Sequence, residues 1–228
     1  ASRTVPFVSK ATGVPLAKMA TKVIMGKTLK ELGFTREIVP EYVSVKEAVF
    51  PFSRFPGVDT ILGPEMKSTG EVMGIDRDFG LAFGKSQLAA GQRVPLSGTV
   101  FISVKDADKE EVLAVARGLS QLGFRILATK GTSRYLLENG VDNMVVNKVR
   151  EGRQHVVDMI KNGEVDLVIN TTHEKKAISE SYSIRRVALT MNVPYTTTLA
   201  GAKATVSAIQ SMTREDLRVR TIQEYHGK

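Results

Sequence analysis

The sequence beyond residue 98 predicts an α/β fold built on a five-stranded, parallel, doubly wound sheet. Short apolar runs alternate there with amphipathic stretches of helical period, and this unit is repeated five times. The apolar runs, such as Leu167-Val168-Ile169, are continuous, which is typical of strands that helices cover on both faces. Strands and helices that alternate in this way indicate a parallel sheet between two layers of helices.

Turn residues separate the five strand–helix units. We expect strands at 99–104, 124–128, 144–146, 166–170 and 195–199, and helices at 109–122, 133–140, 155–162, 179–191 and 202–211. In the first of these helices the apolar side chains recur on one face, and Gly123 stands where a left-handed C-cap belongs. That helix is therefore expected to pack on the sheet.

The first 95 residues lack this regular alternation of strands and helices. The pattern predicts a helix over 14–25, strand structure within 41–52 and a helix over 76–88. Three elements of this size scarcely enclose a core, and the chain starts abruptly in an apolar stretch without an initiator Met. We therefore expect a piece of a larger domain, which ends at the loop-like residues 90–98.

The composition narrows the classes of function. The 228 residues include no cysteine and three histidines, which excludes thiolate nucleophiles and Cys-ligated zinc. No apolar run approaches a membrane span and no signal peptide is recognisable, so we expect a soluble, cytoplasmic protein that binds no membrane.

The net charge of +8 favours anionic partners. Residues 1–95 hold 13 basic and 9 acidic side chains and residues 96–228 hold 19 and 15, so each part carries +4. This even spread, the 6% of aromatic residues and the lack of a nucleic-acid motif disfavour a nucleic-acid-binding module.

Candidate binding residues follow the predicted strands, because ligands of such sheets bind at the carboxyl ends of the strands. Ser103 and Lys109 follow the first strand, and Thr129-Lys130-Gly131-Thr132 follows the second. Hydroxyls, backbone N–H groups and a helix dipole converge there in a way that suits a phosphate. Alternatively, Thr132 or Ser133 is merely an N-cap and Gly131 a turn residue, and the spacing alone leaves both interpretations open.

The later strand ends carry the same kind of chemistry. Lys148 follows the third strand, Asn170-Thr171-Thr172 follows the fourth, and Tyr195-Thr196-Thr197-Thr198 lies in the fifth. Carboxylates and histidines placed for proton transfer are largely missing, which favours binding without catalysis. We expect His155 to cap or line a helix start and His226 to lie in a frayed tail.

Three stretches of the first part are specific enough to indicate a family. They read Arg-Thr-Val-Pro-Phe-Val-Ser-Lys-Ala-Thr-Gly at 3–13, Pro-Phe and Phe-Pro-Gly-Val-Asp within 51–59, and Leu-Gly-Pro-Glu-Met-Lys-Ser-Thr-Gly-Glu-Val-Met-Gly at 62–74. They closely resemble the carboxyl-terminal third of the carbamoyl-phosphate synthetase large subunit. The resemblance covers the whole chain: residues 1–92 are similar to the end of the second ATP-grasp module, and residues 93–228 to the allosteric domain, which is methylglyoxal-synthase-like.

The resemblance implies a ligase that makes carbamoyl phosphate for arginine and pyrimidine biosynthesis. The full enzyme uses bicarbonate, glutamine-derived ammonia and two ATP with Mg²⁺ or Mn²⁺, and its large subunit pairs with a glutaminase small subunit in an oligomer of heterodimers. Of the second ATP site only Arg3 carries over, as a phosphate contact, and the metal ligands of the family lie upstream. The resemblance therefore implies that this chain alone is catalytically silent, with no metal site and no required cofactor.

For the second part, the resemblance implies an allosteric site for UMP, an inhibitor, or IMP, an activator. The matching positions are Ser103, Lys109, Thr129, Lys130, Gly131, Thr132, Lys148, Asn170 and Thr172. Lys130 departs from the histidine of enterobacterial members, which bears on the choice of nucleotide.

An ornithine pocket of the family matches Glu47, Tyr195 and Thr197, although Thr196 replaces an Asp there. Glu71, within the 62–74 stretch, has no assigned role. The enzymatic alternative is methylglyoxal synthase itself, which needs a carboxylate in a Trp-Asp-Pro segment after the fourth strand. This chain has Asn170-Thr171-Thr172 at that place and no Trp, which disfavours that activity.

Overall fold

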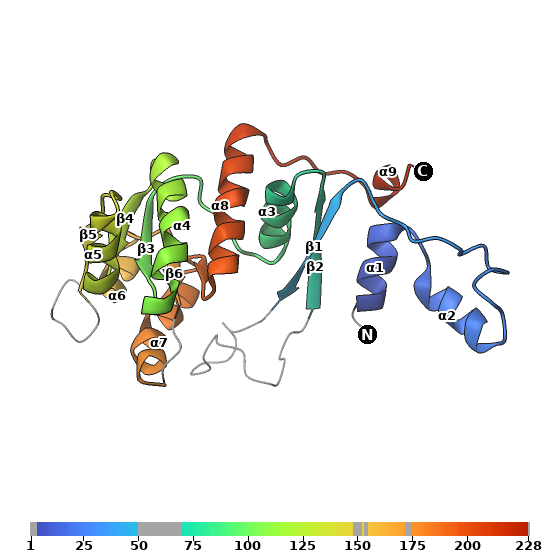
Figure 1. Cartoon of the computed structure of the whole chain (residues 1–228), viewed down its shortest axis with the longest axis horizontal. Helices are drawn as coiled ribbons and strands as arrows, with labels where there is room; N and C mark the ends of the chain where they lie inside the picture. The colour runs from blue at the N-terminus through green and yellow to red at the C-terminus, as the bar shows by residue number, and fades with distance from the viewer. Residues whose placement is uncertain (1–3, 50–69, 148–151, 153–154, 172–174, 228) are drawn as a thin grey trace.

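The computed structural model describes residues 4–49, 70–147, 152, 155–171 and 175–227. The chain forms an elongated molecule in which a larger sheet and its helices occupy one end, and α1 (Thr4–Thr12), α2 (Leu16–Ile24) and α9 (Ile222–Tyr225) lie at the other (Figure 1). None of the helices in these residues is long and apolar enough to cross a bilayer.

The larger sheet confirms the predicted fold class. Its five strands are all parallel, in the order β5-β4-β3-β6-β7. Their bounds are β3 (Thr99–Ser103), β4 (Arg125–Ala128), β5 (Met144–Val145), β6 (Leu167–Asn170) and β7 (Tyr195–Thr196). The strands with the longest apolar runs, β3 and β6, lie inside the sheet, where both faces are buried.

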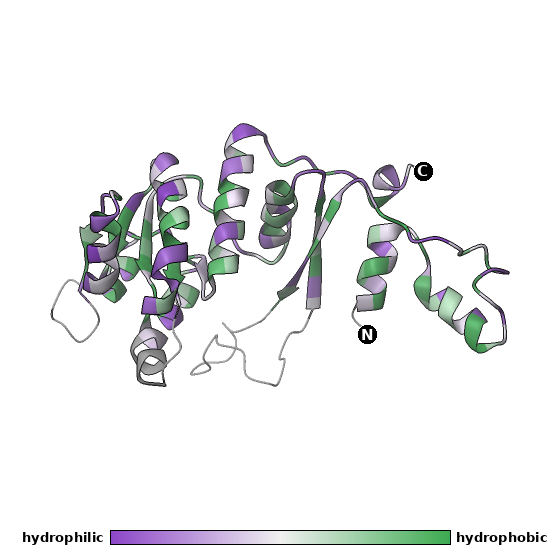
Figure 2. Ribbon diagram, viewed as in Figure 1, coloured by the Kyte–Doolittle hydropathy of each residue, from purple (hydrophilic) through white to green (hydrophobic). Residues whose placement is uncertain are grey.

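Helices cover both faces of this sheet, as expected for a doubly wound fold. The described helices are α4 (Lys109–Gln121), α5 (Lys130–Glu138), α6 (Val156–Lys161), α7 (Lys175–Thr190) and α8 (Leu199–Arg214), and a 3-10 turn, η2 (Asp106–Asp108), precedes α4. Along β3, Val100 and Ile102 pack with side chains of α4, α5 and α8, whereas Phe101 packs with α6 and α7. Figure 2 shows that apolar residues predominate along the central strands, whereas apolar and polar residues alternate along the helices that cover them.

Two helices begin three residues earlier than the sequence predicts. We expected α5 from residue 133 and α8 from residue 202, but they begin at Lys130 and Leu199. For α8 the physical reason is an N-cap, because the Thr198 hydroxyl accepts a hydrogen bond from Gly201 N at 3.1 Å. The threonines that suggested a longer fifth strand therefore end it at residue 196.

The first part of the chain contains two elements that the sequence analysis did not assign. They are α1 (Thr4–Thr12) and β2 (Gly70–Asp76), beside the expected α2 (Leu16–Ile24), β1 (Val43–Val49) and α3 (Phe79–Ala89). In α1, Pro6 lies within the first turn, where the helix needs no N–H from it. The β2 strand pairs with β1 in antiparallel register, with Val45 opposite Gly74.

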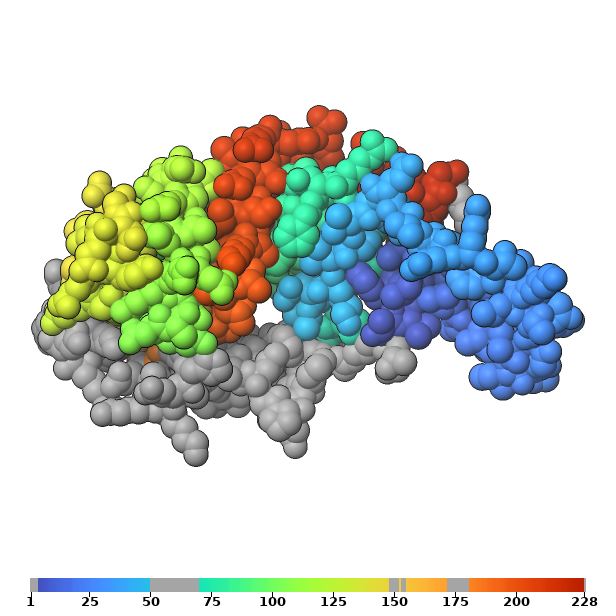
Figure 3. All heavy atoms as spheres, viewed as in Figure 1, coloured from blue at the N-terminus to red at the C-terminus, as the bar shows by residue number. Residues whose placement is uncertain are grey.

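Helix α3 joins the two parts, because it packs on β1 and β2 on one side and on α8 on the other. Three glycines permit these contacts. A Cβ on Gly74 would clash with Ala82 O, and one on Gly80 would clash with Ser207 O. A Cβ on Gly84 would lie 2.6 Å from Met212 Sδ. Figure 3 shows α8 between α4 and α3 on the surface of the molecule.

The division of the chain into two domains between residues 92 and 93 stays a prediction.

We predict unequal effects of alanine at the two glycines that face α8. Gly80→Ala should lower the free energy of unfolding by roughly 1–3 kcal/mol, because the new methyl group meets a backbone carbonyl of α8. Gly84→Ala is the matched control and should cost less, because the thioether of Met212 moves aside more easily. Urea denaturation of the two variants measures the difference, and equal losses would contradict the proposed tight backbone contact.

Asp78 generates a prediction about pH. It is the N-cap of α3, and hydrogen bonds from the Ser211 hydroxyl of α8 and from Leu81 N lower its pKa. A lowered carboxyl pKa adds stability above the unfolded-state value of about 3.9, and this stability is lost as the pH falls through the folded-state pKa. Asp78→Asn keeps a good N-cap without a titrating group. In parallel thermal melts, wild type should therefore have a higher melting temperature than the variant at pH 6, and this difference should disappear toward pH 2.

Candidate functional site

The carboxyl ends of β4, β3 and β6 bring three predicted site residues together. Ser103 is in register with Asn170 on one side, and its hydroxyl lies 3.2 Å from the Thr129 hydroxyl on the other. The Thr129 hydroxyl donates in turn to Thr132 Oγ1 at 3.4 Å. Thr129, Thr132 and Asn170 are all buried. A connected row of hydroxyls therefore lines this edge of the sheet.

The amino terminus of α5 lies at the same edge. Its N-cap residue is Thr129, but no side chain caps the helix within the described structure. Thr132 instead accepts a hydrogen bond from Val104 N at 3.3 Å, which fastens the start of α5 to the end of β3. The interpretation of Thr132 or Ser133 as the N-cap is therefore wrong. A helix amino terminus of this kind suits an anion, because its first N–H groups and the helix dipole favour negative charge.

Lys109 provides a cation beside this helix terminus. A Cβ on Gly131 would lie 3.7 Å from Lys109 Nζ, so the ammonium group lies next to the first turn of α5. Lys109 Nζ also lies 2.8 Å from Asp106 Oδ1. The hydrogen bond and positive charge of Lys109 hold the pKa of Asp106 below its usual range. An anion bound at α5 would compete with this carboxylate for the ammonium group.

Two buried oxygens at this edge have no hydrogen-bond partner within the described structure. They are Asn170 Oδ1, on a side chain that is 2% exposed, and Ser133 Oγ, on one that is 1% exposed. Buried polar atoms normally have partners, because an unpaired one is costly. Asn170 Oδ1 is therefore a buried acceptor for which the described residues supply no donor. Ser133 was missing from the predicted set, although a second hydroxyl in the first turn of α5 was a signal for it.

Three predicted residues, Arg3, Lys148 and Thr172, lie outside the described residues. Lys130 is exposed at the first position of α5, on the same helix terminus as Gly131. Thr171, next to Asn170, accepts from Lys105 N at 3.3 Å and donates its own N–H to Ser103 O at 3.0 Å. These bonds fix the ends of β3 and β6 against each other.

The second predicted pocket involves two parts of the fold. Tyr195 lies in β7 and Thr197 in the turn that leads into α8, whereas Glu47 lies in β1 of the smaller sheet. Burial raises the pKa of the half-buried Glu47 carboxyl, and a 3.0 Å hydrogen bond from Gln87 Nε2 acts in the opposite direction. Glu47 is thus tied to α3 through Gln87.

Glu71, which had no assigned role, forms an ion pair with Lys46 across β1 and β2 at 3.5 Å.

Among the residues that the structure describes, no group of three or more acidic or histidine side chains lies close enough together to hold a metal ion. His155 caps α6, as expected, because its Nδ1 accepts from Asp158 N at 3.3 Å.

Comparisons with known proteins identify relatives of the whole chain. The MGS-like domain family matches residues 111–197. The carbamoyl phosphate synthase large chain of Nostoc sp. is 59% identical over 225 residues, which make up 99% of this chain and 20% of that protein. The corresponding large chain of Archaeoglobus fulgidus is 56% identical over 227 residues, 99% of this chain and 21% of that protein. The matched region is carboxyl-terminal.

The chain thus spans about one fifth of the length of the curated relatives that it matches. Among solved structures, a methylglyoxal synthase from Elizabethkingia anophelis is 22% identical, with a TM-score of 0.42 over 50% of this chain and 80% of that chain.

The Thr132 hydroxyl should prove important for folding before any ligand is added. Thr132→Val keeps the side-chain volume but leaves the buried Val104 N–H without its acceptor, which should cost about 1–3 kcal/mol of stability. Thr132→Ser keeps the acceptor and is the control. Urea unfolding of both variants tests the assignment, and a Val variant as stable as the Ser variant would contradict it.

Proposed function

We propose that this chain, a relative of the carboxyl-terminal region of carbamoyl phosphate synthase large chains over 99% of its length, is the regulatory end of such an enzyme and binds a nucleotide monophosphate. The proposed site is the edge formed by β4, β3 and β6 with the amino terminus of α5. UMP or IMP is the proposed ligand, in keeping with the family resemblance.

The observation that carries this proposal is the set of groups at the start of α5. Three kinds of group lie close together there. They are a helix terminus without a side-chain cap, the row of hydroxyls from Ser103 to Thr132 and the ammonium group of Lys109. Together they offer N–H and O–H donors and a positive charge to a phosphate. Asn170 Oδ1, buried and unpaired, supplies an acceptor for a sugar hydroxyl.

The remaining predicted residues extend the same proposal. Lys130 adds a charge at the start of α5, and Lys148 and Thr172 complete the set that the resemblance implies. Ornithine, bound by Glu47, Tyr195 and Thr197, is a second proposed effector. A thermal-shift screen with UMP, IMP and ornithine tests all three ligands, since a ligand that binds only the folded state raises the melting temperature.

The activity of the whole enzyme is part of the proposal as well. It comprises synthesis of carbamoyl phosphate from bicarbonate, glutamine-derived ammonia and two ATP, with Mg²⁺ or Mn²⁺ and a glutaminase small subunit, in the cytoplasm, for arginine and pyrimidine biosynthesis. This chain alone should be inactive, because the resemblance leaves it only Arg3 of the second ATP site. Carbamoyl phosphate formation by the isolated chain would refute this part.

Methylglyoxal synthesis is not proposed. The reaction needs a carboxylate base after β6, whereas the chain has Asn170-Thr171-Thr172 there. The described strand ends of β3, β4 and β6 present hydroxyls and an amide, which suit binding better than proton abstraction.

Charge changes around Lys109 should alter nucleotide affinity in opposite directions. Lys109→Ala should weaken UMP binding at least about tenfold, as expected for a lost charge-assisted contact to phosphate. Asp106→Asn should strengthen binding severalfold, because the competing carboxylate 2.8 Å from Lys109 Nζ is removed. Calorimetry with UMP measures both effects.

The matched control is Lys161→Ala, which removes the same charge at the end of α6, where the chain leads to the amino end of β6. Its affinity for UMP should equal that of wild type. Equal affinities for all four proteins would refute the site.

A further inference from the structure

Helix α1 depends on side chains from distant parts of the chain for its attachment. Its principal packing partner among the elements is α2, its neighbour in sequence. The last carbonyls of a helix have no partner within the helix. In α1 the carbonyl of Ala11 accepts from the Tyr42 hydroxyl at 2.6 Å, and that of Lys10 accepts from His226 Nε2 at 2.8 Å. The end of α1 is therefore capped from two sides.

The cap from His226 belongs to a carboxyl-terminal segment that crosses the molecule. After α8 ends at Arg214, the chain runs back to a short helix, α9 (Ile222–Tyr225), which lies beside α1 (Figure 1). A capping box between Thr221 and Glu224 starts this helix. The expectation of a frayed tail at His226 is therefore wrong, because contacts distant in sequence hold it.

Tyr225 anchors the same segment to the centre of the molecule. Its hydroxyl donates to Ile75 O, in β2, at 2.8 Å, and Lys85 Nζ of α3 lies 3.4 Å from the same hydroxyl. Its ring meets the ring of Tyr42 edge-on, with centroids 5.2 Å apart. The two adjacent residues Tyr225 and His226 thus connect β2 and α3 to the end of α1.

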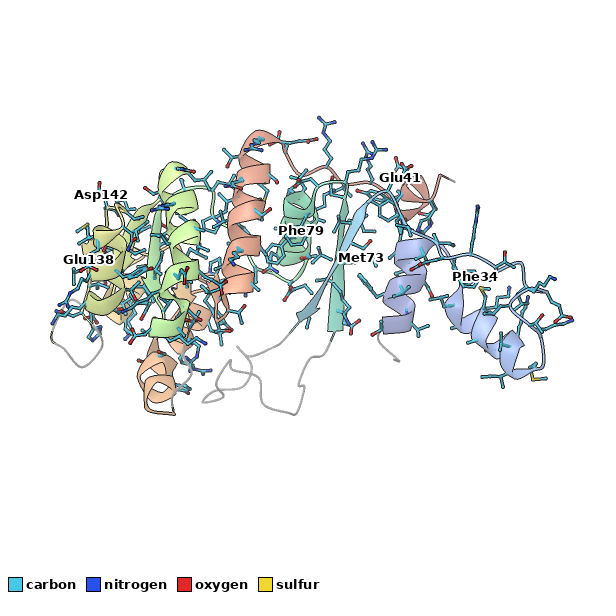
Figure 4. The ribbon with its side chains drawn as sticks, in the orientation of Figure 1. Phe34, Glu41, Met73, Phe79, Glu138 and Asp142 are labelled. Atoms are coloured by element: carbon cyan, nitrogen blue, oxygen red, sulfur yellow. The ribbon has the colours of Figure 1, made fainter. Side chains whose placement is uncertain are left out.

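The site on α1 fits the imidazole closely. Gly13 follows α1 with φ of +74°, and a Cβ there would lie 3.1 Å from the His226 ring. Beside these contacts remains a pocket of about 350 Å³, whose lining includes Glu41, labelled next to α9 in Figure 4. The segment is therefore held by a few specific contacts and not by a continuous apolar interface.

We propose that residues 215–227 form a tether that fixes α1 in position relative to the larger sheet. One end of the tether continues α8, which follows β7, the strand next to β6 of the proposed nucleotide site. The other end holds α1, which follows Arg3 in the chain. On the function proposed above, Arg3 belongs to the second ATP site, so the tether connects the nucleotide site to the ATP site.

Hydrogen exchange of the 228-residue chain tests the tether itself. The double variant Tyr225→Phe/His226→Ala should exchange the amides of α1 at least about tenfold faster than wild type, the factor that corresponds to 1.4 kcal/mol. The amides of β3 should keep wild-type protection. Val219→Ala is the control, because Val219 lies in the same segment and is 98% exposed, and it should leave α1 unchanged.

Unchanged exchange in α1 of the double variant, or an equal increase in the Val219 control, would overturn the tether. If the double variant also loses protection in β3, the single change Tyr225→Phe, which removes one oxygen atom, provides the same comparison with milder perturbation. Wild-type protection of α1 in that variant would equally overturn the proposal.

The coupling is tested in the full-length large chain with its small subunit. The double variant should bind UMP with wild-type affinity in calorimetry, while carbamoyl phosphate synthesis loses most of its response to saturating UMP. A full response would overturn the coupling. A wild-type protein that does not bind UMP would instead refute the proposed function, and the result of the hydrogen-exchange experiment would stand apart from it.

Discussion

The close contact of α3 with its neighbours on both sides is the constraint on which the rest of the structure depends. Gly74 lets β2 approach the backbone of α3, and Gly80 and Gly84 let α8 approach its opposite side. Gly74 and Gly80 face backbone atoms of their neighbours, which rearrange less easily than side chains do, whereas Gly84 faces the side chain of Met212. The first part of the chain, which has too few elements for a core of its own, gains its support from α8 through this helix.

The proposed site uses the groups that a parallel sheet places at one edge. Ser103, Thr129 and Asn170 meet because their strands are adjacent and parallel, although 67 positions separate the first of them from the last in the sequence. Hydroxyls and backbone N–H groups bind an anion without taking part in proton transfer. The described strand ends therefore have the composition of a binding site. Within the described residues, Asp106 is the carboxylate in contact with Lys109, and its negative charge offsets that of the ammonium group until a bound anion takes its place.

Local patterns predicted the larger sheet well and long-range contacts poorly. Continuous apolar runs predicted the inner strands β3, β4 and β6, because burial on both faces leaves little room for polar positions. The edge strands β5 and β7 are exposed or half-buried, and their place in the alternation of strands and helices predicted them. The start of α8 was misplaced because threonines that favour strands precede it, and one of them, Thr198, is its N-cap. The start of α5 was misplaced because Gly131, which lies inside the helix, is typical of a turn. Strand β2 was missed because it contains Gly74, a residue that is unusual inside a strand. The reason for this glycine is the close contact with α3, which the neighbouring sequence does not indicate. Likewise, nothing near His226 in the sequence indicates that it binds Lys10 O.

A nucleotide can regulate a distant site only if it binds two arrangements of the protein with different affinity. The geometry provides the elements that such a change requires. The turn at Thr198 connects the edge of the sheet to α8, a helix of 16 residues that is long enough to act as a lever. Any shift of α8 is passed to α3 through backbone contacts at Gly80 and to α1 through residues 215–227. Two connections from one helix restrain both the position and the orientation of the first part of the chain, whereas one connection would leave it free to pivot. The second connection therefore explains why a segment with so few apolar contacts is held in place by specific hydrogen bonds at its far end.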